Sequence, residues 1–304
     1  QYFDLKYVAK NFNEVNEAVD SGKTKVGIVI PPDFSENLKH GRSATVQVIV
    51  DASDTIAASS AIGAAQLVGQ SKSQQILLQK LRGYSGHPEN PPYDIRIRPW
   101  YNQDFVSPFY MVPGIMGVVL TMTLVMFTSM AIVRERERGT LEQLIVTPMR
   151  TWELLLGKII PYIFVGYVQA TVSLLIGIFV FDLPVQGSLG LLYSLTSLFI
   201  IASLALGVLI SVLAKTQMQA MQMSFFIILP SILLSGFMFP REAMPLFFNT
   251  LGYLLPLTFY LQIMRGIVLK GIGLPMLWGQ VVALIGFIAI VLTISIKKFS
   301  KKIA

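Results

Sequence analysis

Long uncharged apolar runs fill most of the chain after residue 108. Phe109–Val133 contains 25 residues and Ile159–Phe181 contains 23, and neither run includes Asp, Glu, Lys, Arg or His. A helix needs ~20 mostly apolar residues to cross the hydrocarbon core of a bilayer. Three further runs meet this condition, at 191–214, 217–239 and 277–296. We therefore predict five membrane-spanning helices in this chain.

A sixth stretch, Ala243–Met264, also has 22 residues without a charge. If it crossed the membrane, the lysine-rich tail after Ile296 would lie on the opposite side from the charged loop after Val133, whereas basic residues collect on the cytoplasmic side. Pro245 and Pro256 would also break a single helix. We therefore predict a re-entrant pair of short helices over 243–264, which is tolerated at membrane depth only when it is packed inside protein.

Residues 1–108 follow a different pattern, in which short β-like runs alternate with helical ones. We expect helices at Asn13–Asp20 and Thr55–Leu81, and strands at Lys25–Ile30, Thr45–Val50 and Tyr93–Pro99, the last at an exposed edge. The order of the strands is not readable from this pattern. The predicted fold class is an α-helical polytopic membrane protein with an N-terminal α/β domain.

Composition supports a membrane protein. Hydrophobic residues make up 53% of the chain and charged residues only 13%, whereas roughly a quarter of the residues in a soluble domain are charged. The net charge of +7 falls after residue 108, where 13 Lys and Arg face 6 Asp and Glu, while the first 108 residues are balanced at 11 each. Such placement fits positive loops on the inner membrane face and argues against nucleic-acid binding. The chain has no Cys, which excludes disulfides and thiolate metal sites.

No enzyme site emerges in the N-terminal domain. Ser21–Thr24 resembles the end of a phosphate-binding loop, but Glu17 occupies the position that requires glycine, and a strand follows where a helix is needed. His40 and His87 are the only histidines and have no Cys or carboxylate cluster beside them. Asp51 and Asp54 flank the end of a strand, where Asp typically caps a turn or a helix. We therefore predict no catalytic, metal or cofactor-binding residues in this chain.

The charged segment Arg134–Lys158 lies between the first two apolar runs. Thr140 stands three residues before Gln143, the spacing of a capping box that starts a helix at Leu141. In this helix Leu141, Leu144 and Ile145 form one apolar stripe beside Glu142, and Pro148 ends it. A second helix is expected to start at Thr151, with Glu153 in its first turn, and to continue into the next span. From these features alone, a loop that only sets topology remains an equal alternative.

The charged segment resembles the signature of ABC-2 type transporter permeases, the membrane subunits of ATP-driven exporters. The residues that carry the match, in order and spacing, are Glu135, Glu137, Gly139, Thr140, Glu142, Leu144, Thr147, Pro148, Glu153, Gly157 and Lys158. In that family the corresponding segment docks on the ATPase subunit, which implies a coupling role for these residues and for Leu141 and Ile145. Gly22–Phe34 and Ile49–Asp54 also resemble the branch of the family with a large external domain.

The apolar runs lack ionisable residues, which argues against an ion-coupled transporter, and the chain has no phosphate-binding loop. We therefore expect a separate ABC ATPase subunit to bind ATP and Mg²⁺. The leading hypothesis is a dimeric export permease, formed with a second copy or a paralogue, for a drug-like, lipid or polysaccharide solute. The alternative is a transmembrane signal or force transmitter that moves no solute.

The expected location is the cytoplasmic (inner) membrane, with the charged segment 134–158 inside and residues 1–108 outside. The sequence starts at Gln1 without a signal peptide, so we expect one further membrane helix before it, six in the intact protein, and regard a cleaved signal peptide as the alternative. A large external domain would also suit a periplasmic adaptor and an outer-membrane channel as partners.

Overall fold

A computed structural model describes residues 4–40, 44–81, 93–102, 104–139 and 151–300. The chain divides into two compact units, Gln1–Ser107 and Pro108–Ala304. We call them the head and the membrane unit and describe each by itself.

The head contains a small mixed sheet with the strand order β1-β2-β3. Strand β1 (Val26–Val29) is antiparallel to β2 (Ala44–Asp51), whereas β3 (Tyr93–Trp100) is parallel to β2. The helices are α1 (Phe12–Asp20), α2 (Phe34–Lys39) and α3 (Thr55–Leu81). The three strands and the two helices predicted from the sequence are confirmed, and β3 lies at an edge as expected. The sequence pattern missed α2.

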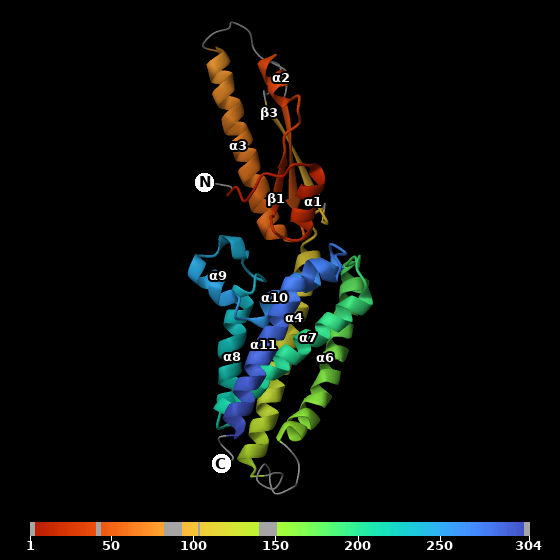
Figure 1. The fold of residues 1–304 in the computed structure, drawn as a ribbon, viewed down its shortest axis with the longest axis vertical. Coiled ribbons are helices and arrows are strands. Elements are labelled where there is room, and N and C mark those ends of the chain that lie inside the picture. The colour runs from red at the N-terminus through yellow and green to blue at the C-terminus, as the bar shows by residue number, and fades with distance from the viewer. Residues whose placement is uncertain (1–3, 41–43, 82–92, 103, 140–150, 301–304) are drawn as a thin grey trace. The chain divides into compact units, whose positions relative to one another are not determined.

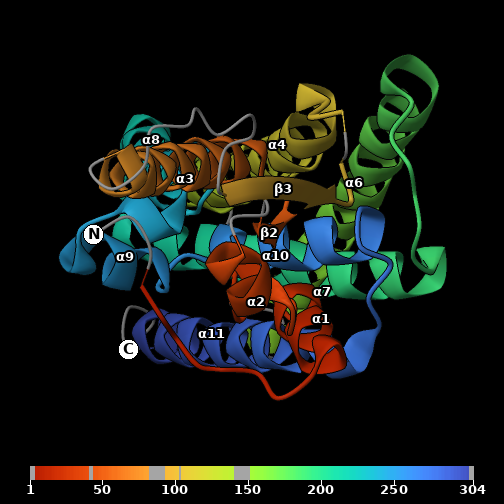
Figure 2. The same ribbon diagram turned by 90° about the horizontal axis from the view of Figure 1, so that it is seen from above.

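Helices pack on opposite faces of the middle strand of the head sheet, β2 (Figure 2). Val48 and Val50 belong to a buried cluster with Ala58 and Ala65 of α3. On the other face a Cβ at Gly27 would lie 2.5 Å from Val15 of α1. Alternate residues of β2 therefore face different helices, which explains why its middle reads as nearly continuous apolar sequence.

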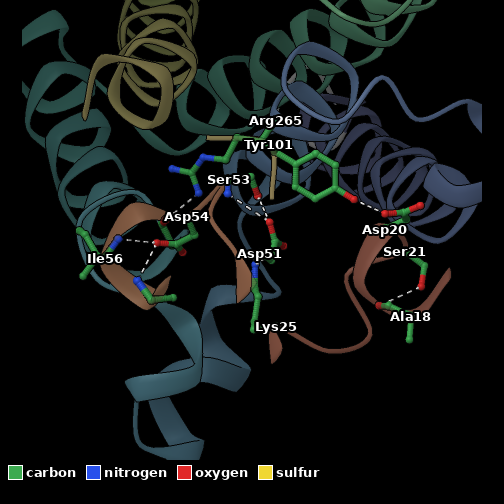
Figure 3. A network of polar contacts seen from close by, with 12 residues as sticks. Ala18, Asp20, Ser21, Lys25, Asp51, Ser53, Asp54, Ile56, Tyr101 and Arg265 are labelled. Carbon is green, nitrogen blue, oxygen red and sulfur yellow. Dashed lines mark hydrogen bonds and ion pairs between the residues drawn. The ribbon is translucent and has the colours of Figure 1, made fainter. Parts of the chain in front are cut away.

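Polar groups near the end of β2 are satisfied inside the head (Figure 3). The Asp51 carboxylate is buried, accepts hydrogen bonds from Ser53 N at 3.1 Å and Ser53 Oγ at 2.6 Å, and lies 3.6 Å from Lys25 Nζ. Asp54 Oδ1 accepts from the backbone N of Ala57 at 3.0 Å in the first turn of α3. Asp51 thus closes a turn and Asp54 caps a helix, as the sequence predicts.

Among the residues that the structure describes, the membrane unit contains five helices long and apolar enough to cross a bilayer, in agreement with the sequence-based prediction. They are α4 (Ser107–Glu137), α6 (Thr151–Phe181), α7 (Leu189–Leu213), α8 (Gln217–Leu234) and α11 (Leu274–Ser300). α7 is the most buried of them. Figure 1 shows α7 crossing the unit obliquely, where it packs against α11, α6 and α8.

Between α8 and α11 the chain forms two short helices, α9 (Leu246–Gly252) and α10 (Pro256–Val268), with a bend of 80° between them. A 3₁₀ turn, η1 (Arg241–Ala243), precedes them. The bend falls before Pro256, which starts α10. By length and composition this pair could also count as one broken span. The re-entrant arrangement over 243–264 therefore stays a prediction.

The core of the membrane unit forms where α10 packs on α7. The rings of Tyr260 and Phe199 stack with centroids 4.0 Å apart, and both side chains are fully buried. The Tyr260 hydroxyl and Thr196 Oγ1 lie 3.2 Å apart, so the buried phenol has a hydrogen-bonding partner. This contact fixes α10 inside the helix bundle.

Candidate coupling site at the end of α4

Helix α4 extends beyond its apolar run into the charged segment. Its 31 residues correspond to a length of about 46 Å at 1.5 Å per residue, longer than a hydrocarbon core of ~30 Å. The helix ends before Gly139, which has a φ of 71°, the left-handed conformation that commonly terminates helices at glycine. Arg134, Glu135 and Glu137 therefore lie on the last turn of a rigid helix.

Helix α6 enters the charged segment from the other side. It begins at Thr151 and runs without a break to Phe181, which confirms the predicted helix that continues into the next span. Glu153, Gly157 and Lys158 therefore lie in its first turns. The other predicted coupling residues lie outside the described residues, namely Thr140, Leu141, Glu142, Leu144, Ile145, Thr147 and Pro148. The short helix expected from Leu141 is thus neither confirmed nor contradicted.

Glu137 contacts the start of α8. Its Oε1 accepts a hydrogen bond from the backbone N of Gln217 at 2.9 Å, and its Oε2 accepts one from the Gln217 side-chain amide. Gln217 is the first residue of α8, where a backbone N–H has no partner within the helix. A carboxylate at this position also interacts favourably with the positive end of the helix dipole.

Arg136 contacts the end of α7. Its Nη1 donates to the carbonyl oxygens of Ser211 at 3.1 Å and Ala214 at 2.9 Å. Ala214 is the C-cap of α7, so the guanidinium lies at the negative end of that helix. A cation in this position typically contributes about 0.3–1 kcal/mol. Arg134 Nε donates to Gln217 Oε1 at 3.2 Å.

These contacts join one turn of α4 to both helix ends at the α7–α8 turn. We call Arg134, Arg136, Glu137 and Gln217, with the Ser211 and Ala214 carbonyls, the α4 clasp. An apolar cluster lies behind it, in which Val133 of α4, Ala214 and Ala220 are fully buried. About two helical turns before Glu137 on α4, the hydroxyl groups of Ser129 and Ser224 lie 3.2 Å apart.

The sequence predicts Glu137 as a residue that couples to a partner, and the structure adds a contact with Gln217 of its own chain while the side chain stays exposed. Gln217 was not predicted as a functional residue, and Arg136 lies between the motif residues without being one of them. The sequence contains one signal for this site, because Thr216 and Gln219 have the spacing of a capping box. In the structure Thr216 Oγ1 accepts a hydrogen bond from the backbone N of Gln219 at 3.2 Å. That signal marks the start of α8, but the partner on α4 lies 80 residues away from Gln217 in the sequence.

Comparison with known proteins finds the same family that the motif residues resemble. Residues 1–297 match the family described as ABC-2 family transporter protein. This chain belongs to the ABC-2 transporter family. The five long apolar helices and this membership make it a multi-pass membrane protein and an ABC transporter permease.

Similar ABC-2 proteins include three from Escherichia coli (strain K12). The probable multidrug ABC transporter permease YbhR is 32% identical over 271 residues, which cover 89% of this chain and 72% of the relative. The probable multidrug ABC transporter permease YbhS is 32% identical over 87% of this chain and 69% of the relative. The inner membrane transport permease YhhJ is 27% identical over 96% of this chain and 77% of the relative.

Proposed function

We propose that this ABC-2 permease forms the translocation path of an ATP-driven exporter in the cytoplasmic membrane, as a dimer with a second copy or a paralogue. The observation that carries the proposal is the charged segment, which joins two 31-residue helices and bears the coupling motif of the family. A separate ABC ATPase subunit binds ATP and Mg²⁺ and docks on this segment.

Charge placement supports the orientation of the exporter. The C-terminal end of α4, the start of α6 and the C-terminal end of α11 lie at one end of the membrane unit (Figure 1). This end carries Arg134, Arg136, Lys215, Lys297 and Lys298. Basic residues favour the cytoplasmic side, so the charged segment faces the ATPase and the head is extracytoplasmic. An external head of this size also suits a periplasmic adaptor and an outer-membrane channel.

The proposed solute is hydrophobic or amphiphilic: a drug-like compound, a lipid or a polysaccharide. The five apolar runs contain no ionisable side chain that would bind a small ion. Two relatives bear the description multidrug ABC transporter permease. A force transmitter that moves no solute is the second candidate, but such transmitters usually have fewer spans than the five long helices found here.

Substitution in the charged segment tests ATP coupling. Leu144→Asp places a charge in the predicted apolar stripe of the predicted short helix, which would need a partner surface because isolated helices below ~12 residues are marginal in water. We expect the variant to insert in the membrane normally, but to lose the co-purifying ATPase or the solute movement that its hydrolysis drives. Reconstituted vesicles with ATP and a panel of amphiphilic solutes provide the measurement.

Glu142→Gln is the matched control, because it keeps the shape of the side chain and removes one charge that the predicted helix holds away from its apolar stripe. Exposed ion pairs are worth only ~0–1 kcal/mol, so this variant should retain most of its transport. If Leu144→Asp kept both ATPase binding and transport at the wild-type level, the charged segment would be only a topogenic loop.

A further inference from the structure

We infer that the α4 clasp passes movement of the charged segment to the α7–α8 turn, and that Arg136, Glu137 and Gln217 are positioning residues for transport. This inference rests on the proposed function, because it takes the charged segment as the place where the ATPase acts. It adds a second point of action at the α7–α8 turn, through Arg136 and Gln217, which are not among the motif residues of the family.

The charge pattern of the clasp matches both helix ends that it contacts. Arg136 lies at the negative end of α7, and the neighbouring Glu137 lies at the positive end of α8. Exchanging the two charges would place each at the unfavourable helix end. The clasp therefore holds the α7–α8 turn in one orientation relative to α4, as a device that transmits movement must do.

The clasp also lies very close to the point where force would enter. Glu137 itself belongs to the predicted coupling motif, and only Arg138 and Gly139 separate it from Thr140, the predicted cap of the short helix. Because α4 ends at Glu137, only two residues of chain separate the clasp from position 140, and a displacement there would not have to pass through a long loop.

The apolar contacts behind the clasp leave little room for α4 to slide past its neighbours. Val133 and Ala214 are fully buried in one cluster. A Cβ at Gly207 of α7 would lie 2.9 Å from the Val125 carbonyl oxygen of α4. Packed interfaces of this kind move as units rather than deforming continuously. We therefore expect the end of α4 and the start of α8 to move together during the transport cycle.

A cysteine pair tests this expectation, since the chain has no native Cys. Glu137→Cys with Gln217→Cys removes the clasp contacts to α8, and a short, reducible bis-methanethiosulfonate reagent can restore a covalent link between the two positions. The assay is solute transport per ATP hydrolysed by the full permease with its ATPase in vesicles. With the thiols reduced, we expect this ratio to fall at least about 5-fold, the low end of coupling between distinct sites. Cross-linking should restore most of it.

Ser129→Cys with Ser224→Cys is the matched control, because these residues join the same two helices and leave the clasp intact. Cross-linking this pair should not change the transport ratio if α4 and α8 move together. If the clasp were purely structural, the reduced permease with Glu137→Cys and Gln217→Cys would melt at a lower temperature. Its ratio of solute transported per ATP hydrolysed would stay unchanged.

The inference would be wrong if the reduced Glu137→Cys and Gln217→Cys permease kept the wild-type ratio of solute transported per ATP hydrolysed. It would also be wrong if cross-linking either this cysteine pair or the pair at positions 129 and 224 abolished transport. Failure of the proposed function would look different. In that case the unmodified permease itself would move no solute in response to ATP.

Discussion

Gly207→Ala tests how closely α7 packs against α4, the helix that leads to the clasp. A Cβ added at position 207 would lie 2.9 Å from the Cβ of Thr128 and 2.9 Å from the backbone oxygen of Val125. The carbonyl oxygen belongs to the backbone of α4 and cannot rotate away. The alanine therefore forces the two helices apart instead of displacing a flexible side chain.

The size of the effect follows from these distances. Non-bonded carbon atoms are most stable ~3.5–4.0 Å apart, so α4 and α7 must separate by roughly 0.6 Å or more at this point. Overpacking of this kind costs about 1–3 kcal/mol, and small residues at helix contacts in membranes serve to allow such close approach. Because 1 kcal/mol shifts the melting temperature of a domain of 150–250 residues by ~2–4 °C, we expect a decrease of about 2–12 °C.

Thermal unfolding of the purified permease in detergent measures this shift. Gly286→Ala on α11 is the matched control, since a Cβ there meets no atom within 4 Å. Alanine is favoured over glycine in helices by up to ~1 kcal/mol, so this control should melt at or slightly above the wild-type temperature. If Gly207→Ala melted at or above the wild-type temperature, the packing argument for this contact would be wrong.

Two further predictions concern orientation and the head. For orientation, a membrane-impermeant maleimide should label Ser188→Cys in intact cells and label Ser300→Cys only after permeabilisation, and labelling of both from outside would mean that α9 and α10 together cross the membrane. In the head, Asp51→Ala removes the buried acceptor for both Ser53 hydrogen bonds and the partner of Lys25. We expect a loss of about 1–3 kcal/mol, seen as faster hydrogen exchange in β1 and β2 of the full chain, and unchanged exchange there would contradict the role assigned to this carboxylate.

The sequence by itself determined the type and approximate limits of most elements. Uncharged runs of more than 20 residues, such as Phe109–Val133, become membrane helices because no other single segment satisfies every backbone polar group in lipid. The period of two in Tyr93–Pro99 marked a strand, and Asp54 marked the start of α3, because both signals depend on neighbouring residues only. The coupling motif likewise identified the family from one continuous segment.

Only the tertiary structure decided which partners those elements meet. The parallel pairing of β3 with β2 and the hydrogen bonds from Gln217 to Glu137 connect residues distant in sequence, so no local periodicity encodes them. Glu137 illustrates the limit. Its position in the motif predicts a coupling residue, and the packing of α4 against α7 and α8 also brings its carboxylate to the N-terminal end of α8, whose first N–H group has no partner within its own helix.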